Sequence, residues 1–281
     1  MKITELFERG EFVVSAEVGP PKGINIDHLL EEAKEYLSNI TAVNVTDNQS
    51  SVMRMGSLGV CKALKDVGLN PIFQMTCRDR NLNATKALLL GLAIEGVHNV
   101  LLVTGDPIPS ENRDEVKSVF NFNSRKLARF VTSLNETALR TPFRVFAALN
   151  VNAPNFKIQL EMAQEKEAAG VVGFLTQPVL SPEAVENLQL ARETLSGKLL
   201  GGIFPVVSHR NALFLNNEIA GIRVSDDIIA RYEGKDRSDA EALAVELSAE
   251  MAEKIAPYTD GLYFMTPFKR VALMERILKA L

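Results

Sequence analysis

Two carboxylates adjoin apolar segments of this chain, where an acidic side chain is costly to desolvate. Glu17 ends the run FVVSAE (12–17), and Asp106 comes just after the run NVLLVT (99–104) in the string NVLLVTGDP. Burial among apolar neighbours raises the pKa of a carboxyl, so Glu17 is a candidate general acid. Asp106 allows two interpretations, because aspartate beside glycine and proline is also a common turn former.

The elements that must position these residues follow a regular alternation. Short apolar or β-branched runs are followed by longer segments with helical spacing of apolar residues. The predicted strands are 12–17, 42–46, 71–76, 99–104, 143–149, 171–176, 199–205 and 261–266. The predicted helices are 27–39, 52–67, 83–95, 124–139, 156–169, 182–195 and 268–281. Two or three extra helices are expected after the seventh strand, including 208–217 and 239–255.

Eight such units without a Gly, Ser or Pro-rich linker predict an α/β protein, a single-domain (β/α)₈ TIM barrel over residues 1–281. A doubly wound open sheet is the main alternative. No G-x-G-x-x-G follows the first predicted strand, where a dinucleotide-binding sheet of that kind usually has it, and this favours the barrel.

Polar residues are concentrated at the C-terminal ends of the predicted strands, where barrel enzymes build their active sites. They are Glu17, Thr46, Asp47, Asn48, Gln74, Thr76, Arg78, Asp79, Thr104, Asp106, Asn150, Asn152, Thr176, Gln177, Ser208, His209 and Thr266. The opposite ends are entered through Gly, Pro and Asn. A turn role for Asp106 alone would not explain this concentration, so the pattern favours a site.

Individual members of this set keep structural alternatives. The Gln177 amide offers a donor and an acceptor, which suits a ring with both kinds of edge, and the alternative is a satisfied core amide. For Glu17 the alternative is an ion pair with Arg78 or Arg80. In the string TCRDRN these two arginines and Asp79 either bind phosphate or pair with one another.

Composition excludes several classes of function. The net charge of -4 leaves no basic face for nucleic acid or an anionic membrane, and no run is long enough to span a bilayer. Two cysteines, with Cys77 interpreted as packing, fit a reducing compartment, so we expect a cytoplasmic protein. The three histidines are scattered, so no metal site is expected; His98 is interpreted as structural and His209 as a site candidate.

The motifs AEVGPPKG, VTDNQSS, QMTCRDRN, LLVTGDP, FLTQPV, GIFPVVSHRNALFLNNEIAGIRVSD and MTPF occur in this order along the chain. Together they resemble the methylenetetrahydrofolate reductase family, and most closely its methyltransferase-associated or acetogen-type branch. The resemblance implies an oxidoreductase barrel with a flavin, FAD or alternatively FMN, across its C-terminal face. The implied reaction reduces 5,10-methylenetetrahydrofolate to 5-methyltetrahydrofolate in one-carbon and methionine metabolism.

The resemblance also implies residue roles. Glu17 matches the general acid that opens the five-membered ring of the folate, Asp106 the carboxylate that stabilises the resulting cation, and Gln177 the amide that holds the folate. His209 is a further expected substrate contact. Thr46 and Lys166 match flavin-contacting positions, and the expected flavin site also includes Gln74, Thr76, Arg78, Arg80, Thr104, Asp106 and Asn150.

Three departures from the family pattern remove specific flavin contacts. Gln74 replaces a histidine, Thr104 an arginine found in some members, and Leu149 a tyrosine. A phenylalanine that sandwiches nicotinamide or folate in better-known members falls near His209, so the electron donor stays open between NADH, NADPH and an electron-transfer partner subunit. A homo-oligomer is also left open. A non-catalytic barrel subunit of a one-carbon complex is the alternative from another class. An aldolase-type barrel ranks last, because no strand end carries a lysine for a Schiff base.

Overall fold

Eight parallel strands close into a barrel in which each strand pairs with the next and β8 pairs with β1. The computed structural model describes residues 3–219, 221–266 and 270–281. The strands are β1 (Val13–Val18), β2 (Ala42–Val45), β3 (Pro71–Thr76), β4 (Asn99–Val103), β5 (Arg144–Leu149), β6 (Gly173–Pro178), β7 (Lys198–Ile203) and β8 (Gly261–Phe264). The predicted (β/α)₈ barrel is confirmed, and the open-sheet alternative is wrong.

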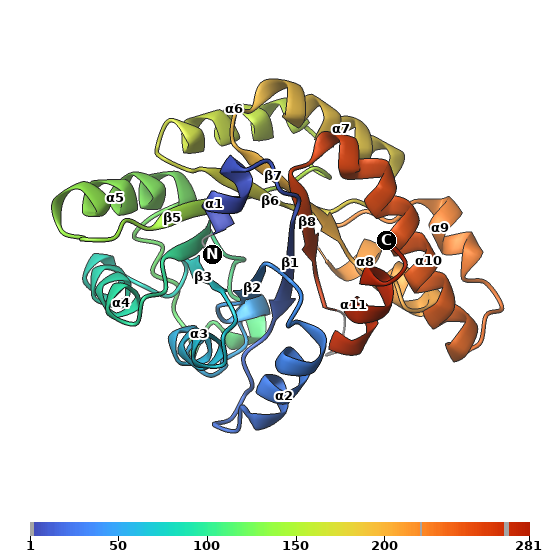
Figure 1. Cartoon of the computed structure of the whole chain (residues 1–281), viewed down its shortest axis with the longest axis horizontal. Helices are drawn as coiled ribbons and strands as arrows, with labels where there is room; N and C mark the ends of the chain where they lie inside the picture. The colour runs from blue at the N-terminus through green and yellow to red at the C-terminus, as the bar shows by residue number, and fades with distance from the viewer. Residues whose placement is uncertain (1–2, 220, 267–269) are drawn as a thin grey trace.

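A ring of helices surrounds the barrel (Figure 1). They are α2 (Asp27–Tyr36), α3 (Ser57–Asp66), α4 (Leu82–Ile94), α5 (Ser124–Thr137), α6 (Phe156–Glu167), α7 (Pro182–Thr194), α10 (Arg237–Ile255) and α11 (Val271–Leu278). The extra helices predicted after the seventh strand are present as α8 (His209–Glu218) and α10, and a third helix, α9 (Asp226–Arg231), lies between them. The predicted beginning of the last helix, Phe268, lies outside the described residues.

Two predicted boundaries are wrong for local backbone reasons. The helix expected from residue 52 begins at Ser57, because Asn48, Ser50 and Ser51 have positive φ angles and form a loop with one short turn, η1 (Gln49–Ser51). The sixth strand begins at Gly173 rather than at residue 171. Gly170, with φ +94°, ends α6, and the Val171 amide caps that helix by donating to the Lys166 carbonyl.

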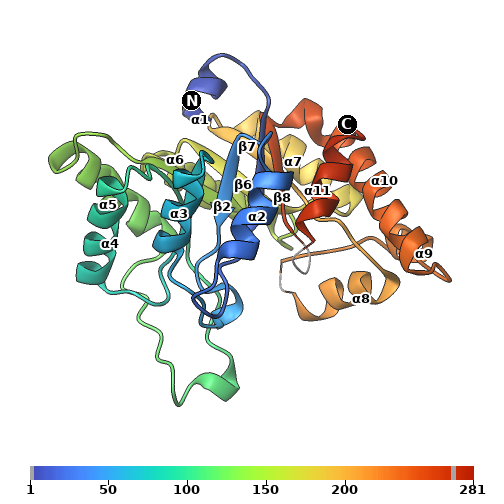
Figure 2. The same ribbon diagram turned by 60° about the horizontal axis from the view of Figure 1, so that its bottom comes forward.

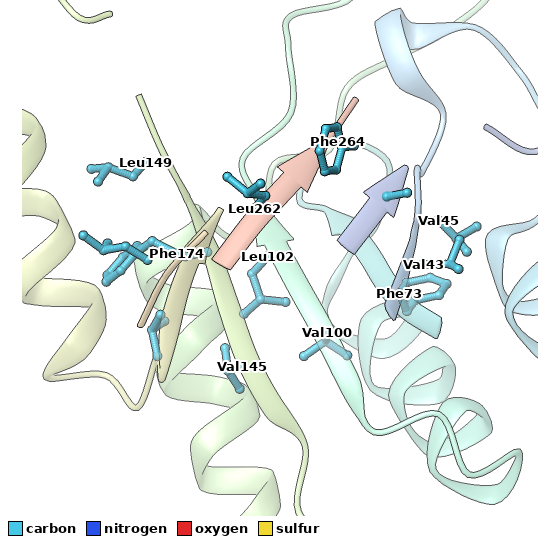
Figure 3. Packing of buried hydrophobic residues seen from close by; sticks show 14 of the residues in the cluster. Val43, Val45, Phe73, Val100, Leu102, Val145, Leu149, Phe174, Leu262 and Phe264 are labelled. Carbon is cyan, nitrogen blue, oxygen red and sulfur yellow. The ribbon is translucent and has the colours of Figure 1, made fainter. Parts of the chain in front are cut away.

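The helices pack on the outward-facing residues of the strands. Alternate residues of a strand point to opposite faces, so Val43 and Val45 of β2 both face outward (Figure 3). They join Phe73, Val100, Leu102, Val145, Phe174, Leu262 and Phe264 in one buried layer. Full burial of each such side chain contributes about 1.5–3 kcal/mol. This layer therefore holds the strands and helices in fixed relation around the site.

An N-terminal helix, α1 (Ile3–Glu8), closes one end of the barrel. Its Ile3 and Phe7 are buried in a cluster with inward-facing residues of the strands, which are Val13, Ala42, Ile72, Leu101, Phe146, Leu175, Leu200 and Tyr263. Figure 2 shows α1 at one end of the molecule, with α8 and the long loop between β4 and α5 at the other. The strand ends that carry polar residues therefore face away from the apolar closure.

Strand β8 approaches β1 so closely that its first position requires glycine. A Cβ atom on Gly261 would lie 2.1 Å from the Val13 carbonyl oxygen, which is far inside van der Waals contact. The glycine therefore permits the contact between the last and first strands that closes the barrel.

Candidate active site

The three residues expected to act in chemistry lie at the same end of the barrel. Glu17 is the penultimate residue of β1, Gln177 is the penultimate residue of β6, and Asp106 follows β4 by three residues. Because all eight strands are parallel and the barrel is closed, their C-terminal ends surround one face. Glu17 and Gln177 are partly exposed there, and Asp106 is exposed.

Glu17 is held by two side chains of neighbouring strands. The Tyr263 hydroxyl of β8 donates a hydrogen bond to Glu17 Oε2, and Asn44 Nδ2 of β2 lies 3.3 Å from the same oxygen. Asn44 Nδ2 also lies 3.2 Å from Gln74 Oε1 and 3.1 Å from Tyr263 Oη. The predicted alternative, an ion pair of Glu17 with Arg78 or Arg80, is wrong, because both arginines bind other carboxylates.

Desolvation raises the pKa of Glu17 above its ordinary value, and the hydrogen bonds from Tyr263 and Asn44 oppose that rise only in part. This direction is the one a general acid requires, because it keeps the carboxyl protonated at higher pH. The expectation drawn from the apolar run FVVSA, that burial raises this pKa, therefore agrees with the surroundings of Glu17.

The raised pKa predicts that the stability of the protein depends on pH. Because the folded state favours the protonated form of Glu17, the contribution of this residue to the free energy of unfolding is greatest below the unfolded pKa of 4.5. This contribution is lost as the pH rises through the raised pKa of the folded state. We expect the free energy of unfolding of Glu17→Gln to increase relative to wild type as the pH rises, by about 1.4 kcal/mol per unit of pKa shift. Urea unfolding at a series of pH values measures this difference. A difference that stays constant with pH would contradict it.

The two arginines after β3 are engaged by carboxylates. Arg78 forms a bidentate ion pair with Asp79, with Nε–Oδ1 and Nη2–Oδ2 distances of 2.7 and 2.9 Å. Arg80 pairs with Asp47 after β2, with Nη1–Oδ2 and Nη2–Oδ1 distances of 2.5 and 3.0 Å. Of the alternatives left open by the sequence, pairing is the one found in this structure. Phosphate binding by either guanidinium stays a prediction and would have to compete with these pairs.

Arg78 also connects three loops of the face. Its Nη2 donates to the Asn48 carbonyl after β2 at 2.9 Å, and its Nη1 lies 3.5 Å from the Asp106 carbonyl after β4. Its own carbonyl accepts from the Val119 amide in the loop before α5 at 2.7 Å. Arg78 is 2 % exposed, and its contact with the Asp106 carbonyl helps to hold the segment that carries Asp106.

Three threonines of the expected flavin site differ in their partners. Thr46 is buried just after β2, and among the described residues its hydroxyl has no hydrogen-bond partner. The Thr76 hydroxyl lies 3.3 Å from the Thr104 carbonyl, which links the ends of β3 and β4. Thr104 is exposed, and its hydroxyl lies 3.3 Å from that of Ser124 at the start of α5. A flavin contact for each of them stays a prediction.

Gln177 and Asn150 lie on adjoining parts of the face. Gln177 lies beside Gly202 of β7, where an added Cβ atom would be 2.6 Å from the Gln177 carbonyl oxygen. This glycine therefore lets the strand that carries Gln177 pack closely against β7. Asn150, just after β5, accepts a hydrogen bond from the Asn152 amide at 2.9 Å.

His209 and Lys166 differ in their access to this face. His209 is the first residue of α8 and is partly exposed. Lys166 is buried on α6, and its Nζ donates to the Ala148 carbonyl at 2.8 Å. Burial, with a smaller effect of Arg125, lowers the pKa of Lys166 to about 8. Its predicted flavin contact is not tested by this arrangement.

Sequence reasoning missed two members of the Glu17 network. Tyr263 lies in the run GLYF and Asn44 in the run AVNV, and both resemble ordinary strand residues. Strand register offered a signal for Asn44, because Glu17 and Asn44 are partners in the pairing of β1 with β2. Asp47 was noted as a strand-end residue without a role, and its pairing with Arg80 supplies one.

Two pockets flank the barrel. One, of about 590 Å³, adjoins the first turn of α8 and is lined in part by Arg210, Lys235, Arg237 and Arg270. The other, of about 350 Å³, lies between α9 and α10. Neither is lined by Glu17, Asp106 or Gln177. Within the described ranges, no cluster of three or more His, Cys, Asp or Glu residues is arranged to hold a metal, and no helix has the length and hydrophobicity to span a membrane.

The residues at this face fit the polar edge of a flavin ring better than they fit its phosphates. Two oxygens without a hydrogen-bond partner in the described part of the chain, Thr46 Oγ1 and Asn44 Oδ1, together with the amide of Gln177, offer donors and acceptors of the kind the ring uses. For the phosphates, by contrast, the two nearby arginines are already paired with carboxylates, Arg78 with Asp79 and Arg80 with Asp47. Leu149, where the family pattern has a tyrosine, is buried in the layer between strands and helices and faces away from the barrel interior (Figure 3).

Comparison with known proteins agrees with this architecture. A solved structure described as an uncharacterized protein from Clostridium thermocellum that binds two copies of 5-methyl-5,6,7,8-tetrahydrofolic acid matches with a TM-score of 0.70 and 12% identity, over 99% of each chain. At that identity the likeness concerns the fold. None of the curated proteins matches in sequence. The sequence profile of the methylenetetrahydrofolate reductase family matches residues 2–281, and the chain therefore belongs to that family.

Proposed function

We propose that the protein catalyses the flavin-dependent reduction of 5,10-methylenetetrahydrofolate to 5-methyltetrahydrofolate. The observation that carries this proposal is Glu17, a desolvated carboxyl with a raised pKa at a strand end of a barrel of this family. The methylene bridge of the substrate is a poor hydride acceptor until N10 is protonated and leaves. A carboxyl whose pKa is raised by burial above its ordinary value suits this requirement.

The other residues of the face have complementary roles in this proposal. Glu17 gives its proton to N10, the N10–CH₂ bond breaks, and a cation forms at N5 of the folate. The side chain of Asp106, which follows β4 at the same face, stabilises that cation. The amide of Gln177 orients the pterin through its donor and acceptor. A flavin, when bound, would supply the hydride for the reduction, and the residues of this face would orient the folate and hold the proton that N10 needs.

The proposed ligands are FAD, with FMN as the alternative, a folate, and NADH or NADPH as donor. The relative from Clostridium thermocellum that binds a methyltetrahydrofolate supports a folate as substrate. The pocket beside the first turn of α8 is lined by four cationic side chains and by Asp236, and two of the cations, Arg270 and Arg237, also contact Glu241. Such a pocket suits the anionic end of a folate or of a nicotinamide dinucleotide.

The visible absorbance spectrum of the purified protein is the first test. We expect a yellow preparation that oxidises 5-methyltetrahydrofolate with an artificial electron acceptor, and whose released flavin can be identified by chromatography. A colourless preparation that neither FAD nor FMN reactivates would reject the flavoenzyme.

A second candidate is a barrel subunit that depends on an electron-transfer partner or is itself non-catalytic. It is favoured by the engagement of Arg78 and Arg80 with carboxylates and by the departures at Gln74, Thr104 and Leu149. Copurification with a second chain, together with turnover only in the complex, would support this candidate over the first.

A further inference from the structure

Tyr263 packs its ring among apolar side chains of the barrel interior and places its hydroxyl in the network around Glu17. The residue is 6 % exposed, and its ring belongs to the inner cluster with Val13, Phe146 and Leu200. A phenylalanine would fill the same space without a group that must be hydrogen bonded. The hydroxyl contacts Glu17 Oε2 and Asn44 Nδ2, so both of its contacts belong to the network around the candidate acid.

These contacts define how the hydroxyl can act. Asn44 Nδ2 can only donate, so in the contact with Asn44 the Tyr263 oxygen is the acceptor. Its one proton is then free to be donated to Glu17. A charge-assisted bond of this kind is stronger once the carboxyl has lost its proton. The arrangement therefore favours the form of Glu17 that exists after proton transfer.

We propose that Tyr263 is a positioning residue for Glu17: its hydroxyl fixes the orientation of the carboxyl and stabilises the carboxylate that forms when the proton leaves. The inference rests on the proposed function and extends it by one residue. Glu17 gives its proton to N10 of the folate and ends the step as a carboxylate that accepts hydrogen bonds from Tyr263 and Asn44. It regains a proton from water, since it is partly exposed.

Tyr263 is not itself the source of the proton. Burial, followed by the nearby charge of Glu17, raises the pKa of Tyr263 well above its ordinary value, so the phenol keeps its proton throughout. The neighbouring strands present Asn44 from β2 and Tyr263 from β8 to the carboxyl, and Thr266 donates to the Glu17 backbone carbonyl.

Charged groups near the same face are occupied elsewhere. Asp47 pairs with Arg80 and Asp79 with Arg78, and within the described residues neither arginine forms an ion pair with Glu17. A change in the titration of Glu17 after removal of the Tyr263 hydroxyl can therefore be assigned to that hydroxyl.

The test replaces Tyr263 with phenylalanine and measures folate turnover against pH. We expect kcat to fall about 10- to 100-fold, the effect of losing one hydrogen bond to a charged group, with little change in flavin reduction by its donor. Because the lost bond favoured the carboxylate, the pKa of Glu17 rises and the alkaline limb of the profile moves to higher pH. Tyr232→Phe is the matched control, since it removes a buried hydroxyl that donates to the Val206 carbonyl.

A profile for Tyr263→Phe that falls in height without moving along the pH axis would overturn the proposal, because a purely structural role has that effect. Global replacement of the four tyrosines with 3-fluorotyrosine tests it without the risk of misfolding. The more acidic phenol donates more strongly, so the alkaline limb should move to lower pH. No movement would again reject the role of Tyr263.

Failure of this inference can be separated from failure of the proposed function. Infrared difference titration of the free protein follows the Glu17 carboxyl band, which is identified by its loss in Glu17→Gln. If wild type lacks folate turnover, the proposed function fails, but the band should still titrate at higher pH in Tyr263→Phe than in wild type. If turnover is present and the band does not move, Tyr263 has no such role.

Discussion

Replacing Glu17 with glutamine should lower the rate of folate reduction about 10²- to 10⁴-fold while flavin reduction by its donor stays close to wild type. Glutamine has nearly the shape of glutamate, so it can still accept hydrogen bonds from Tyr263 and Asn44. It cannot deliver a proton to N10, and without that proton the methylene bridge does not open. Stopped-flow measurement of the two half-reactions separates these effects.

Exposed Glu31 of α2 provides the control for this substitution. Glu31→Gln makes the same chemical change away from the strand ends and should leave both half-reactions unchanged. If Glu17→Gln slowed both half-reactions equally, the side chain would serve flavin binding or folding, and the general-acid role would be rejected.

Replacing Arg80 with methionine should lower the free energy of unfolding by about 3–5 kcal/mol. The side chain of Asp47 is only 3 % exposed, and Arg80 supplies both of its charged hydrogen bonds. The remaining partner shown is the Thr76 amide, at 3.0 Å from Asp47 Oδ2, which cannot compensate a buried charge. Urea unfolding at neutral pH measures the loss.

Two further variants distinguish a buried unpaired charge from loss of packing. Arg125→Met breaks an ion pair with Glu165 that is much more exposed, and should change stability by no more than about 1 kcal/mol. In the Asp47→Asn background the same Arg80→Met change should cost much less, because no charge is left unpaired. Equal costs in both backgrounds would show that Arg80 acts through its packing.

The barrel could be predicted from the sequence because its signals are local and repeat eight times. Each strand is a short apolar run between turn residues, and the predicted runs overlap all eight strands. The misses have equally local causes. Helix α1 is only six residues long, and its Ile3 and Phe7 gain their role from the barrel interior that they close. Val171 looks like a strand residue but caps α6.

The site was less accessible to the same reasoning, because it depends on contacts between distant segments. The presence of Glu17, Asp106 and Gln177 at one face followed from the barrel alone. Whether Arg80 binds phosphate or a carboxylate depends on Asp47, which is 33 residues away. Tyr263 is 246 residues from Glu17, and in the string GLYF nothing distinguishes its hydroxyl from that of any core tyrosine.

The apolar closure formed by Ile3 and Phe7 determines from which end ligands can reach the barrel interior. In the described part of the chain, the side chains of α1 and of the inner strand residues fill this end of the barrel interior. In the proposed reaction, the substrates, the products and the water that returns a proton to Glu17 would all enter and leave at the C-terminal face of the barrel. The folate and the nicotinamide donor would then compete for access to this face, so an excess of either one should slow the binding and release of the other.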